Sequence, residues 1–401
     1  MPRLIVDRPV LHMTSDLGRV MAAAKAREQR GERVFHLERG EPDFDTPPHV
    51  CEALGAAARA GETHYPDARG TLAFREVLRS KLERYNRIAC AADDIVVTDG
   101  GTHALFMAFQ SLLGTGDELL VLSPFWMAIP KLVGFAQGST FRSLPLYLDI
   151  ATGALDAAGI AARLRGALRP NTRGIYVNSP NNPTGVVLTR AHLEAIAAVA
   201  IERDLWVVSD EAYEHLLFDD TEHVSIASLP GMAERTVSVY TFSKSYAMTG
   251  WRLGYVVSPP AMRGVMGPLL AFYTTHGVFP AVQTAGRVAV TGPQDAVETM
   301  RRAYLERRDL LLNELAGQGV ITAPVPNGAF YVFANVGGAL QGRDLWSLID
   351  EWLELGLAAL PGTAFGPEYG DWVRLSLATR REDVAAAGAL LRSQYAGARV
   401  S

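Results

Sequence analysis

The sequence contains little of what defines several large classes of protein. It has two cysteines among 401 residues, Cys51 and Cys90, which stand far apart and match no metal or redox spacing. We therefore expect two reduced thiols in a cytoplasmic protein. No window of 18 residues is uninterruptedly apolar, which argues against a membrane-spanning helix. The stretch Met1–Val10 lacks the apolar core of a signal peptide.

Charge and histidine patterns exclude further classes. The formal net charge is −5, and no run of five like charges occurs, so a nucleic-acid-binding surface is not expected. The nine histidines never form a metalloprotease spacing, and no metal site is predicted. With 48% hydrophobic and 20% charged residues, the chain has the composition of a soluble globular protein. Its length indicates two domains, or one large domain with an appendage.

Between about residues 45 and 290, short apolar segments alternate with helical ones. The segments rich in Val, Ile and Leu, as strands buried on both faces are, predict strands at Ile95–Thr98, Glu118–Leu122, Gly174–Asn178, Leu205–Ser209, Thr236–Thr241 and Leu253–Val257. The helices predicted between them include Thr102–Leu113, Pro124–Phe135, Arg190–Glu202 and Pro260–Tyr273. This alternation indicates an α/β fold with a mostly parallel sheet.

The last hundred residues have a different pattern, which is typical of a smaller α+β domain. The predicted elements are a helix over Gln294–Leu315, a strand over Ala329–Val336, a helix near Asp344–Glu354, a strand over Trp372–Leu377 and a helix over Glu382–Gln394. No linker, repeat or low-complexity stretch separates the two parts. The division is therefore expected to be a packing boundary.

Three polar fragments follow predicted strands. They are residues 179–185 (Ser-Pro-Asn-Asn-Pro-Thr-Gly), residues 209–213 (Ser-Asp-Glu-Ala-Tyr) and residues 241–254, which contain Lys244 and Arg252. Ligands of open α/β sheets bind outside the carboxyl ends of the strands, where these fragments fall. Together they offer an amine that can form an imine, a carboxylate, neutral hydrogen-bonding groups and a fixed cation. That set is what a pyridoxal phosphate site needs.

Each fragment by itself has a simpler interpretation. An isolated lysine is usually a solvated surface residue, and Lys244-Ser245 imitates the end of a nucleotide-binding P-loop, although the glycines of that motif are missing. Asp210 alone could be a helix N-cap, and residues 182–185 alone could be a turn. The order of the three fragments along one chain favours the cofactor site.

With these motifs, the chain resembles the class I (fold type I) aminotransferases, nearest to their bacterial aspartate-aminotransferase-like branch. The resemblance runs from about Gly40 to Ala378, and departs from the pattern at Thr241, where glycine or serine is usual. It implies a large domain at 45–293 with a mostly parallel seven-stranded sheet. A small domain then combines residues 1–44 and 294–401.

The resemblance also assigns roles to residues. It implies that Lys244 holds the cofactor and moves the proton, that Asp210 faces the pyridinium nitrogen, that Asn182 and Tyr213 donate to the phenolic oxygen, and that Trp126 stacks on the ring. The phosphate ligands would come from Gly100, Gly101, Thr102, Thr241, Ser243 and Arg252, with Tyr65 reaching the phosphate of a neighbouring subunit in a homodimer with shared sites. Arg374 would bind the substrate α-carboxylate, with Gly40 and Asn182 beside it.

The substrate remains open at this stage. The aspartate-specific branch usually has a lysine directly after the paired glycines, where this chain has Thr102. His12, His103, Arg142 and His276 are further polar residues that could contact a substrate, but no motif assigns any of them to the pocket. Aspartate, aromatic, aliphatic and basic amino acids are all candidates, with 2-oxoglutarate as the expected acceptor. A lyase, eliminase or cyclase with the same cofactor is the closest alternative. A transcription regulator with an aminotransferase-like domain would need an attached DNA-binding module, and only about forty residues precede Gly40, so this alternative is disfavoured. A non-catalytic binding protein is disfavoured because every side chain expected for catalysis is present.

Overall fold

The structure, a computed structural model, describes residues 15–317 and 319–396. The predictions that concern Met1–Val10 and His12 lie outside these ranges. None of the helices within the described ranges combines the length and the apolar character that crossing a bilayer requires.

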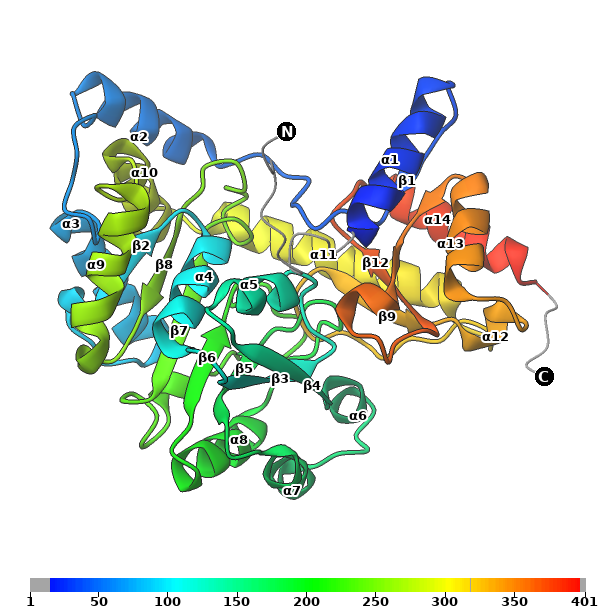
Figure 1. Ribbon diagram of the computed structural model, residues 1–401. Coiled ribbons are helices and arrows are strands. Elements are labelled where there is room, and N and C mark those ends of the chain that lie inside the picture. The colour runs from blue at the N-terminus through cyan, green and yellow to red at the C-terminus, as the bar shows by residue number, and fades with distance from the viewer. Residues whose placement is uncertain (1–14, 318, 397–401) are drawn as a thin grey trace, which may run out of the picture.

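The larger part of the molecule is built on a seven-stranded sheet (Figure 1), which confirms the predicted fold class. Strand β8 runs antiparallel to both of its neighbours, and the other adjacent pairs are parallel. In spatial order the strands are β2 (Ile95–Thr98), β8 (Gly254–Val257), β7 (Thr236–Thr241), β6 (Trp206–Asp210), β5 (Thr172–Asn178), β3 (Glu118–Ser123) and β4 (Thr140–Pro145).

Alternate residues of the central strands pack into different cores. On β3, Leu119 and Val121 enter one core, while Leu120 and Leu122 enter another on the opposite face. Helices therefore cover both faces of the sheet, as Figure 1 shows. They are α2 (Pro48–Arg59), α3 (Leu72–Lys81), α4 (Gly101–Leu112), α5 (Ile129–Phe135), α6 (Tyr147–Ala151), α7 (Ala157–Ala167), α8 (Arg190–Glu202), α9 (Arg263–Thr274) and α10 (Pro280–Thr291).

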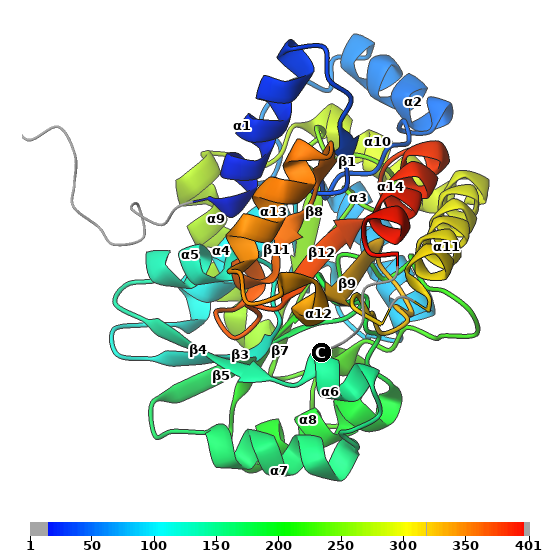
Figure 2. The same ribbon diagram turned by 90° about the vertical axis from the view of Figure 1, so that its right-hand side faces the viewer.

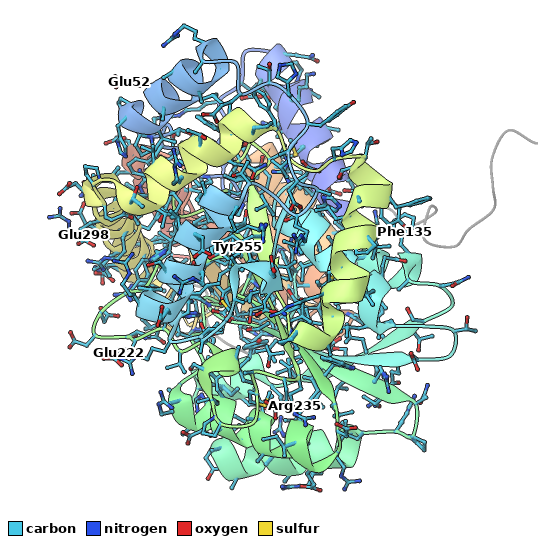
Figure 3. The ribbon with its side chains drawn as sticks, turned by 90° about the vertical axis from the view of Figure 1, so that its left-hand side faces the viewer. Glu52, Phe135, Glu222, Arg235, Tyr255 and Glu298 are labelled. Carbon is cyan, nitrogen blue, oxygen red and sulfur yellow. The ribbon has the colours of Figure 1, made fainter. Side chains whose placement is uncertain are left out.

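The antiparallel strand β8 is also buried in the interior of the larger part. Tyr255 on β8 lies in the interior, whereas Glu52, Glu222 and Glu298 reach the periphery of the molecule (Figure 3). The Tyr255 ring stacks on Tyr240 of the neighbouring strand, with ring centroids 4.8 Å apart.

The smaller part contains two short sheets and the remaining helices (Figure 2). Strand β1 (Phe35–His36) pairs with β10 (Leu357–Ala358), and β12 (Trp372–Ser376) lies between β11 (Leu360–Pro361) and β9 (Tyr331–Asn335). The helices are α1 (Asp16–Gln29), α11 (Asp295–Leu315), α12 (Gly337–Leu340), α13 (Leu345–Glu354) and α14 (Arg381–Gln394).

One hydrophobic core joins the N-terminal segment to the C-terminal part. It includes Val20 and Leu37 together with Trp352 and Leu375, and Arg19 of α1 also donates a hydrogen bond of 2.9 Å to Asp350 of α13. These contacts support the division at 45–293 against 1–44 and 294–401, which stays a prediction.

Candidate active site

The sheet topology brings the polar fragments to one edge. Strands β5, β6 and β7 are parallel neighbours, and they end at Asn178, Asp210 and Thr241. Lys244 follows β7 directly. Arg252 precedes β8, and because β8 is antiparallel its beginning lies at the same edge. Residues far apart in the sequence therefore meet at the carboxyl end of the parallel strands.

A cavity of about 640 Å³ opens at this edge between the two parts of the molecule. The predicted site residues that line it are Gly40, Gly101, Thr102, Trp126, Asn182, Asp210, Tyr213, Thr241, Ser243, Lys244, Arg252 and Arg374. Gly100 is not among the lining residues but closely approaches one of them, Arg252. The structure thus collects nearly all of the predicted residues in one place.

Lys244 points into the cavity. Its Nζ donates a hydrogen bond of 2.6 Å to the carbonyl oxygen of Gly40. Burial lowers the pKa of Lys244 to about 8; the positive charges of Arg374 and Arg252 act in the same direction, while Glu41 and Asp210 oppose them. A larger fraction of this amine is consequently uncharged near neutral pH than for an ordinary lysine, which makes it a better nucleophile and base.

Asp210 lies at the floor of the cavity, with only 6% of its surface exposed. The Tyr176 hydroxyl donates to its carboxylate at 2.8 Å, and the Ala212 backbone N–H donates at 3.2 Å. Burial nevertheless raises the pKa of Asp210 to about 6. Among the described residues, no cation lies within hydrogen-bonding distance of this carboxylate, so it is suited to pair with a ring nitrogen that carries a proton.

Arg374 is a buried cation. Its guanidinium donates to the Glu38 carbonyl oxygen at 2.6 Å and to the Asn182 side-chain oxygen at 3.2 Å, and it lies over the Tyr331 ring. Its Nε has no hydrogen-bond partner, and no carboxylate among the described residues forms an ion pair with it. Burial of this uncompensated charge lowers the pKa of Arg374. A carboxylate that entered the cavity would supply the missing partner.

Two hydroxyl groups connect Arg374 to the cavity floor. The hydroxyls of Tyr213 and Tyr331 are 3.0 Å apart, and the amide of Asn182 lies 3.5 Å from Tyr213. Sequence reasoning found Tyr213 and Asn182 but missed Tyr331. The strand around Tyr331 is mostly apolar, so nothing marked its hydroxyl as a cavity group before the pairing of β9 with β12 was known.

The opposite end of the cavity forms a cradle for an anion. Gly100 has φ +83°, and a Cβ added there would lie 2.4 Å from a guanidinium nitrogen of Arg252. That guanidinium is held by the carbonyl oxygens of Thr249 at 2.7 Å and Asp99 at 3.0 Å. Helix α4 begins at Gly101, with no acidic residue in its first turn. Backbone N–H groups, a fixed cation and small residues are what a phosphate group requires.

Apart from Gly100, four candidate residues within the described ranges do not line this cavity. Tyr65 is 78% exposed and stacks on His276, with ring centroids 4.5 Å apart, so its predicted reach to a neighbouring subunit stays a prediction. His103 contacts Asp99, and Arg142 is paired with Glu118. His103, Arg142 and His276 are absent from the lining of this cavity, and His12 lies outside the described residues.

The cavity lining includes two charged residues that the sequence analysis did not predict as site residues. Arg39 and Glu41 flank Gly40, and both line the cavity. The Arg39 side chain is 49% exposed and has only Glu38, at 3.4 Å, as an ion-pair partner in the described structure. Thr249 donates a hydrogen bond to Glu41. The sequence signal for both is their position beside Gly40 in the loop that the resemblance had already linked to the substrate.

The chain belongs to the aminotransferase class I and II family, whose profile matches residues 32–389. It is 40% identical over 375 residues to the aspartate/prephenate aminotransferase of Thermus thermophilus, which covers 91% of this chain and 92% of that protein. It is 38% identical over 355 residues to the arginine–pyruvate transaminase of Pseudomonas aeruginosa, which covers 88% of each. The solved structure of the aspartate aminotransferase from Thermus thermophilus with maleate superposes with a TM-score of 0.89 at 36% identity, over 97% of this chain and all of that one.

The protein is accordingly an enzyme that transfers an amino group between an amino acid and a 2-oxo acid, and its cofactor is pyridoxal 5′-phosphate. The cavity fits this cofactor on observations of its own. The cradle around Gly100 and Arg252 takes an anion, the buried Asp210 carboxylate takes a protonated ring nitrogen, and the Lys244 amine lies in the same cavity.

Proposed function

We propose that Lys244 binds pyridoxal phosphate covalently and acts as the proton carrier of amino-group transfer. The observation that carries this proposal is the Lys244 amine, which lies in a cavity shared with Asp210 and Arg374 and has a pKa of about 8. The bound cofactor supplies an electron sink that makes the substrate α-proton acidic. The free Lys244 amine would accept the α-proton as general base and deliver it, as general acid, to the cofactor carbon that carries the amino group at the end of the half-reaction.

The other cavity residues bind and orient. Arg374 takes the substrate α-carboxylate, with Asn182 and the Gly40 backbone beside it. Asp210 holds the proton on the cofactor ring nitrogen, and Asn182 and Tyr213 donate to its phenolic oxygen. Trp126 stacks on the ring face. The phosphate is bound by Arg252, by the hydroxyls of Thr241 and Ser243 and by the backbone from Gly100 to Thr102.

Lys244→Ala tests the central role. We expect this variant to lose essentially all transamination and to give no cofactor adduct after borohydride reduction, whereas mass spectrometry of the reduced wild type should locate the adduct on residue 244. Lys25→Ala, which removes an exposed lysine of α1, is the matched control and should behave as wild type. A wild-type adduct on any other lysine would refute the assignment.

We infer that the amino donor is a dicarboxylic amino acid such as aspartate and that 2-oxoglutarate is the acceptor. Several relatives are named aspartate aminotransferases. Arg39 supports the inference from this chain itself, because a half-exposed guanidinium at the cavity is available for the distal carboxylate that a lysine at position 102 would otherwise meet.

Glu41 favours a second candidate, a basic donor such as arginine, because its carboxylate at the same cavity would attract a guanidinium.

Steady-state kinetics with aspartate, arginine and tyrosine separate the dicarboxylic donor from the basic one. For a dicarboxylate enzyme, Arg39→Leu should raise KM for aspartate about tenfold or more while KM for tyrosine stays unchanged. If Glu41→Gln instead impairs arginine selectively, the basic donor is correct. Pyruvate and ammonia released without an oxo-acid acceptor would indicate elimination.

We also propose a homodimer with shared sites, working in the cytoplasm. Around the C-terminal end of α9, Phe272, Tyr273 and Phe279 are exposed by 84, 49 and 44%, next to Tyr65 and its partner His276; such a patch favours an interface. Cys51 and Cys90 are unpaired, which agrees with a reducing compartment.

Mixing inactive Lys244→Ala with an impaired Tyr65→Ala variant tests the shared site. Activity should be restored if each site uses residues of both subunits, and it should not be restored if each site is self-contained.

A further inference from the structure

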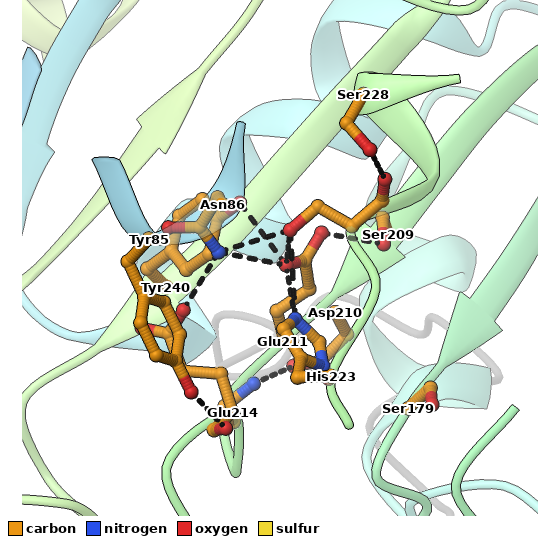
Figure 4. Close-up of polar contacts among 12 residues, drawn as sticks. Tyr85, Asn86, Ser179, Ser209, Asp210, Glu211, Glu214, His223, Ser228 and Tyr240 are labelled. Carbon is orange, nitrogen blue, oxygen red and sulfur yellow. Dashed lines mark hydrogen bonds and ion pairs between the residues drawn. The ribbon is translucent and has the colours of Figure 1, made fainter. Parts of the chain in front are cut away.

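A second buried polar cluster lies behind the active site, on the far side of the turn that follows β6. Asp210 and Tyr213 line the cavity, whereas the residues that directly follow each of them, Glu211 and Glu214, enter this cluster. Both glutamates are nearly inaccessible, with 2 and 6% of their surface exposed. Figure 4 shows Glu211 with Asn86, His223 and Tyr240 around it. Two buried carboxylates need strong partners, because burying an unpaired charge is costly.

Besides Asn86, described below, four groups bind the Glu211 carboxylate. One carboxylate oxygen accepts from Ser225 at 2.5 Å and from the Tyr240 hydroxyl at 3.1 Å, and lies 2.7 Å from His223 Nε2. The other oxygen accepts from Ser209 at 3.0 Å. The Glu211 side chain therefore ties the turn to the loop at 223–225 and to the neighbouring strand β7.

Glu214 forms a buried ion pair with Lys81. The Lys81 ammonium donates to both carboxylate oxygens, at 2.5 and 2.6 Å, and Tyr85 donates to the Glu214 carbonyl oxygen at 2.9 Å. Burial alone would raise the pKa of Glu214, but the Lys81 charge brings it down to about 2. Burial also lowers the pKa of Lys81, and the Glu214 charge opposes that shift. The pair attaches the turn to the end of α3.

Asn86 connects the two glutamates. Its amide donates to Glu214 at 2.8 Å, to Ser225 at 2.9 Å and, at 3.4 Å, to Glu211. It is the last residue of a π-helical turn, Leu82–Asn86, that continues α3 and ends at Arg87 with φ 58°. Such turns are rare and often serve a functional site. Here the turn directs the Asn86 amide into the cluster.

The cluster is not a free cation site. Glu211, Glu214 and His223 offer ligand atoms within 4.8 Å of one another, but the position that a metal would take beside Glu214 is held by the Lys81 ammonium. The Lys81 side chain therefore supplies the positive charge beside Glu214 that a metal ion would otherwise supply.

We propose that Lys81 and Asn86 are positioning residues for the cofactor, because they fix Glu211 and Glu214 and thereby set the direction of the Asp210 carboxylate and the Tyr213 hydroxyl. The turn from Glu211 to Glu214, directly after β6 ends at Asp210, is neither helix nor strand, and few backbone bonds hold it. The N–H of Glu211 donates to Val239 at 2.9 Å, the N–H of Glu214 donates to Glu211 at 3.2 Å, and Tyr213 accepts from the N–H of Leu216 at 2.8 Å. Side chains must therefore hold it. This inference rests on the roles proposed above for Asp210 and Tyr213.

Two variants test the proposal without leaving a buried charge unpaired. Lys81→Met with Glu214→Met removes the whole ion pair, which proteins often tolerate when both partners are replaced. Asn86→Ala removes the connecting amide. Arg142→Met with Glu118→Gln is the matched control, because it removes a partly buried ion pair where β3 and β4 begin, at the end of the sheet away from the cavity.

The readouts are the dissociation constant for pyridoxal phosphate, the absorbance maximum and pH midpoint of the bound cofactor, and the melting temperature of the cofactor-free protein. Both anchor variants should bind the cofactor about tenfold more weakly or worse, the change that one charge-assisted hydrogen bond produces, and should shift its spectrum. The control should change the melting temperature alone.

Asp210→Asn separates this inference from the proposed function. If Asp210→Asn leaves the cofactor spectrum and affinity unchanged, the assignment of Asp210 itself is wrong. If Asp210→Asn changes them but the anchor variants only lower the melting temperature, as the control does, then the cluster is merely structural and the positioning role is refuted.

Discussion

Asp210→Asn should stabilise the cofactor-free protein while it weakens cofactor binding. The Asp210 carboxylate is 6% exposed and its pKa is raised to about 6 by burial. In the unfolded chain the same group has a pKa near 3.8. Ionised Asp210 is therefore a cost to folding until a cationic partner arrives. Asparagine has the same shape without the charge. Its side-chain oxygen can accept from the Ala212 N–H, and its NH2 group can donate to the Tyr176 hydroxyl oxygen, which reverses the bond that Tyr176 donates to the carboxylate.

The magnitude and its pH dependence follow from these two pKa values. Below pH 3.8 both states hold the proton and no penalty exists. Between pH 3.8 and 6 the unfolded chain releases the proton first, so stability falls as the pH rises; above pH 6 the full penalty remains. A shift of roughly two pKa units corresponds to about 3 kcal/mol at pH 7.5 and to about half of that at pH 5.

Urea unfolding of cofactor-free wild type and variant at pH 5 and 7.5 measures this difference. We expect the variant to gain more stability at pH 7.5 than at pH 5, by about 1.4 kcal/mol, and to hold pyridoxal phosphate less tightly. Asp45→Asn, at an exposed position, controls for the loss of one negative charge. A gain that is absent, or equal at the two pH values, would show that Asp210 is ionised without penalty and would refute the reasoning.

Three other outcomes test the cavity. Because the pKa of Lys244 is about 8, the rate of covalent cofactor attachment, followed by absorbance, should reach its plateau near pH 9 instead of rising to about pH 10.4 as for a free lysine. Gly100→Ala should weaken cofactor affinity about tenfold or more by displacing Arg252, whereas Gly116→Ala, also at positive φ but with nothing within 4 Å of the new Cβ, should cost stability alone. Arg374→Lys should raise KM for every amino acid substrate about tenfold or more, since one ammonium cannot replace two parallel hydrogen bonds; an unchanged KM would remove Arg374 from the carboxylate site.

Much of the fold could be predicted because buried parallel strands have a strong sequence signal. The eight predicted strands all occur, with ends that differ by at most two residues. Strand β4 was missed because it is the edge strand, where Thr140–Pro145 is partly exposed and lacks an apolar run. The helix predicted at Pro124–Phe135 begins only at Ile129, because residues 124–128 form the turn that brings Trp126 to the cavity.

The residues at the floor of the cavity could be predicted from the sequence more completely than the residues that the smaller part contributes. Asp210, Lys244 and Asn182 follow strands that are neighbours in the sheet, so a correct set of strands already places them together. Tyr331, Arg39 and Glu41 reach the cavity only because the smaller part packs over the sheet edge, and that packing has no local sequence pattern. The chemistry common to the family is therefore encoded locally. The choice of substrate depends on tertiary contacts, and for this reason a change at Arg39 or Glu41 should alter which amino acid is used while leaving cofactor binding intact.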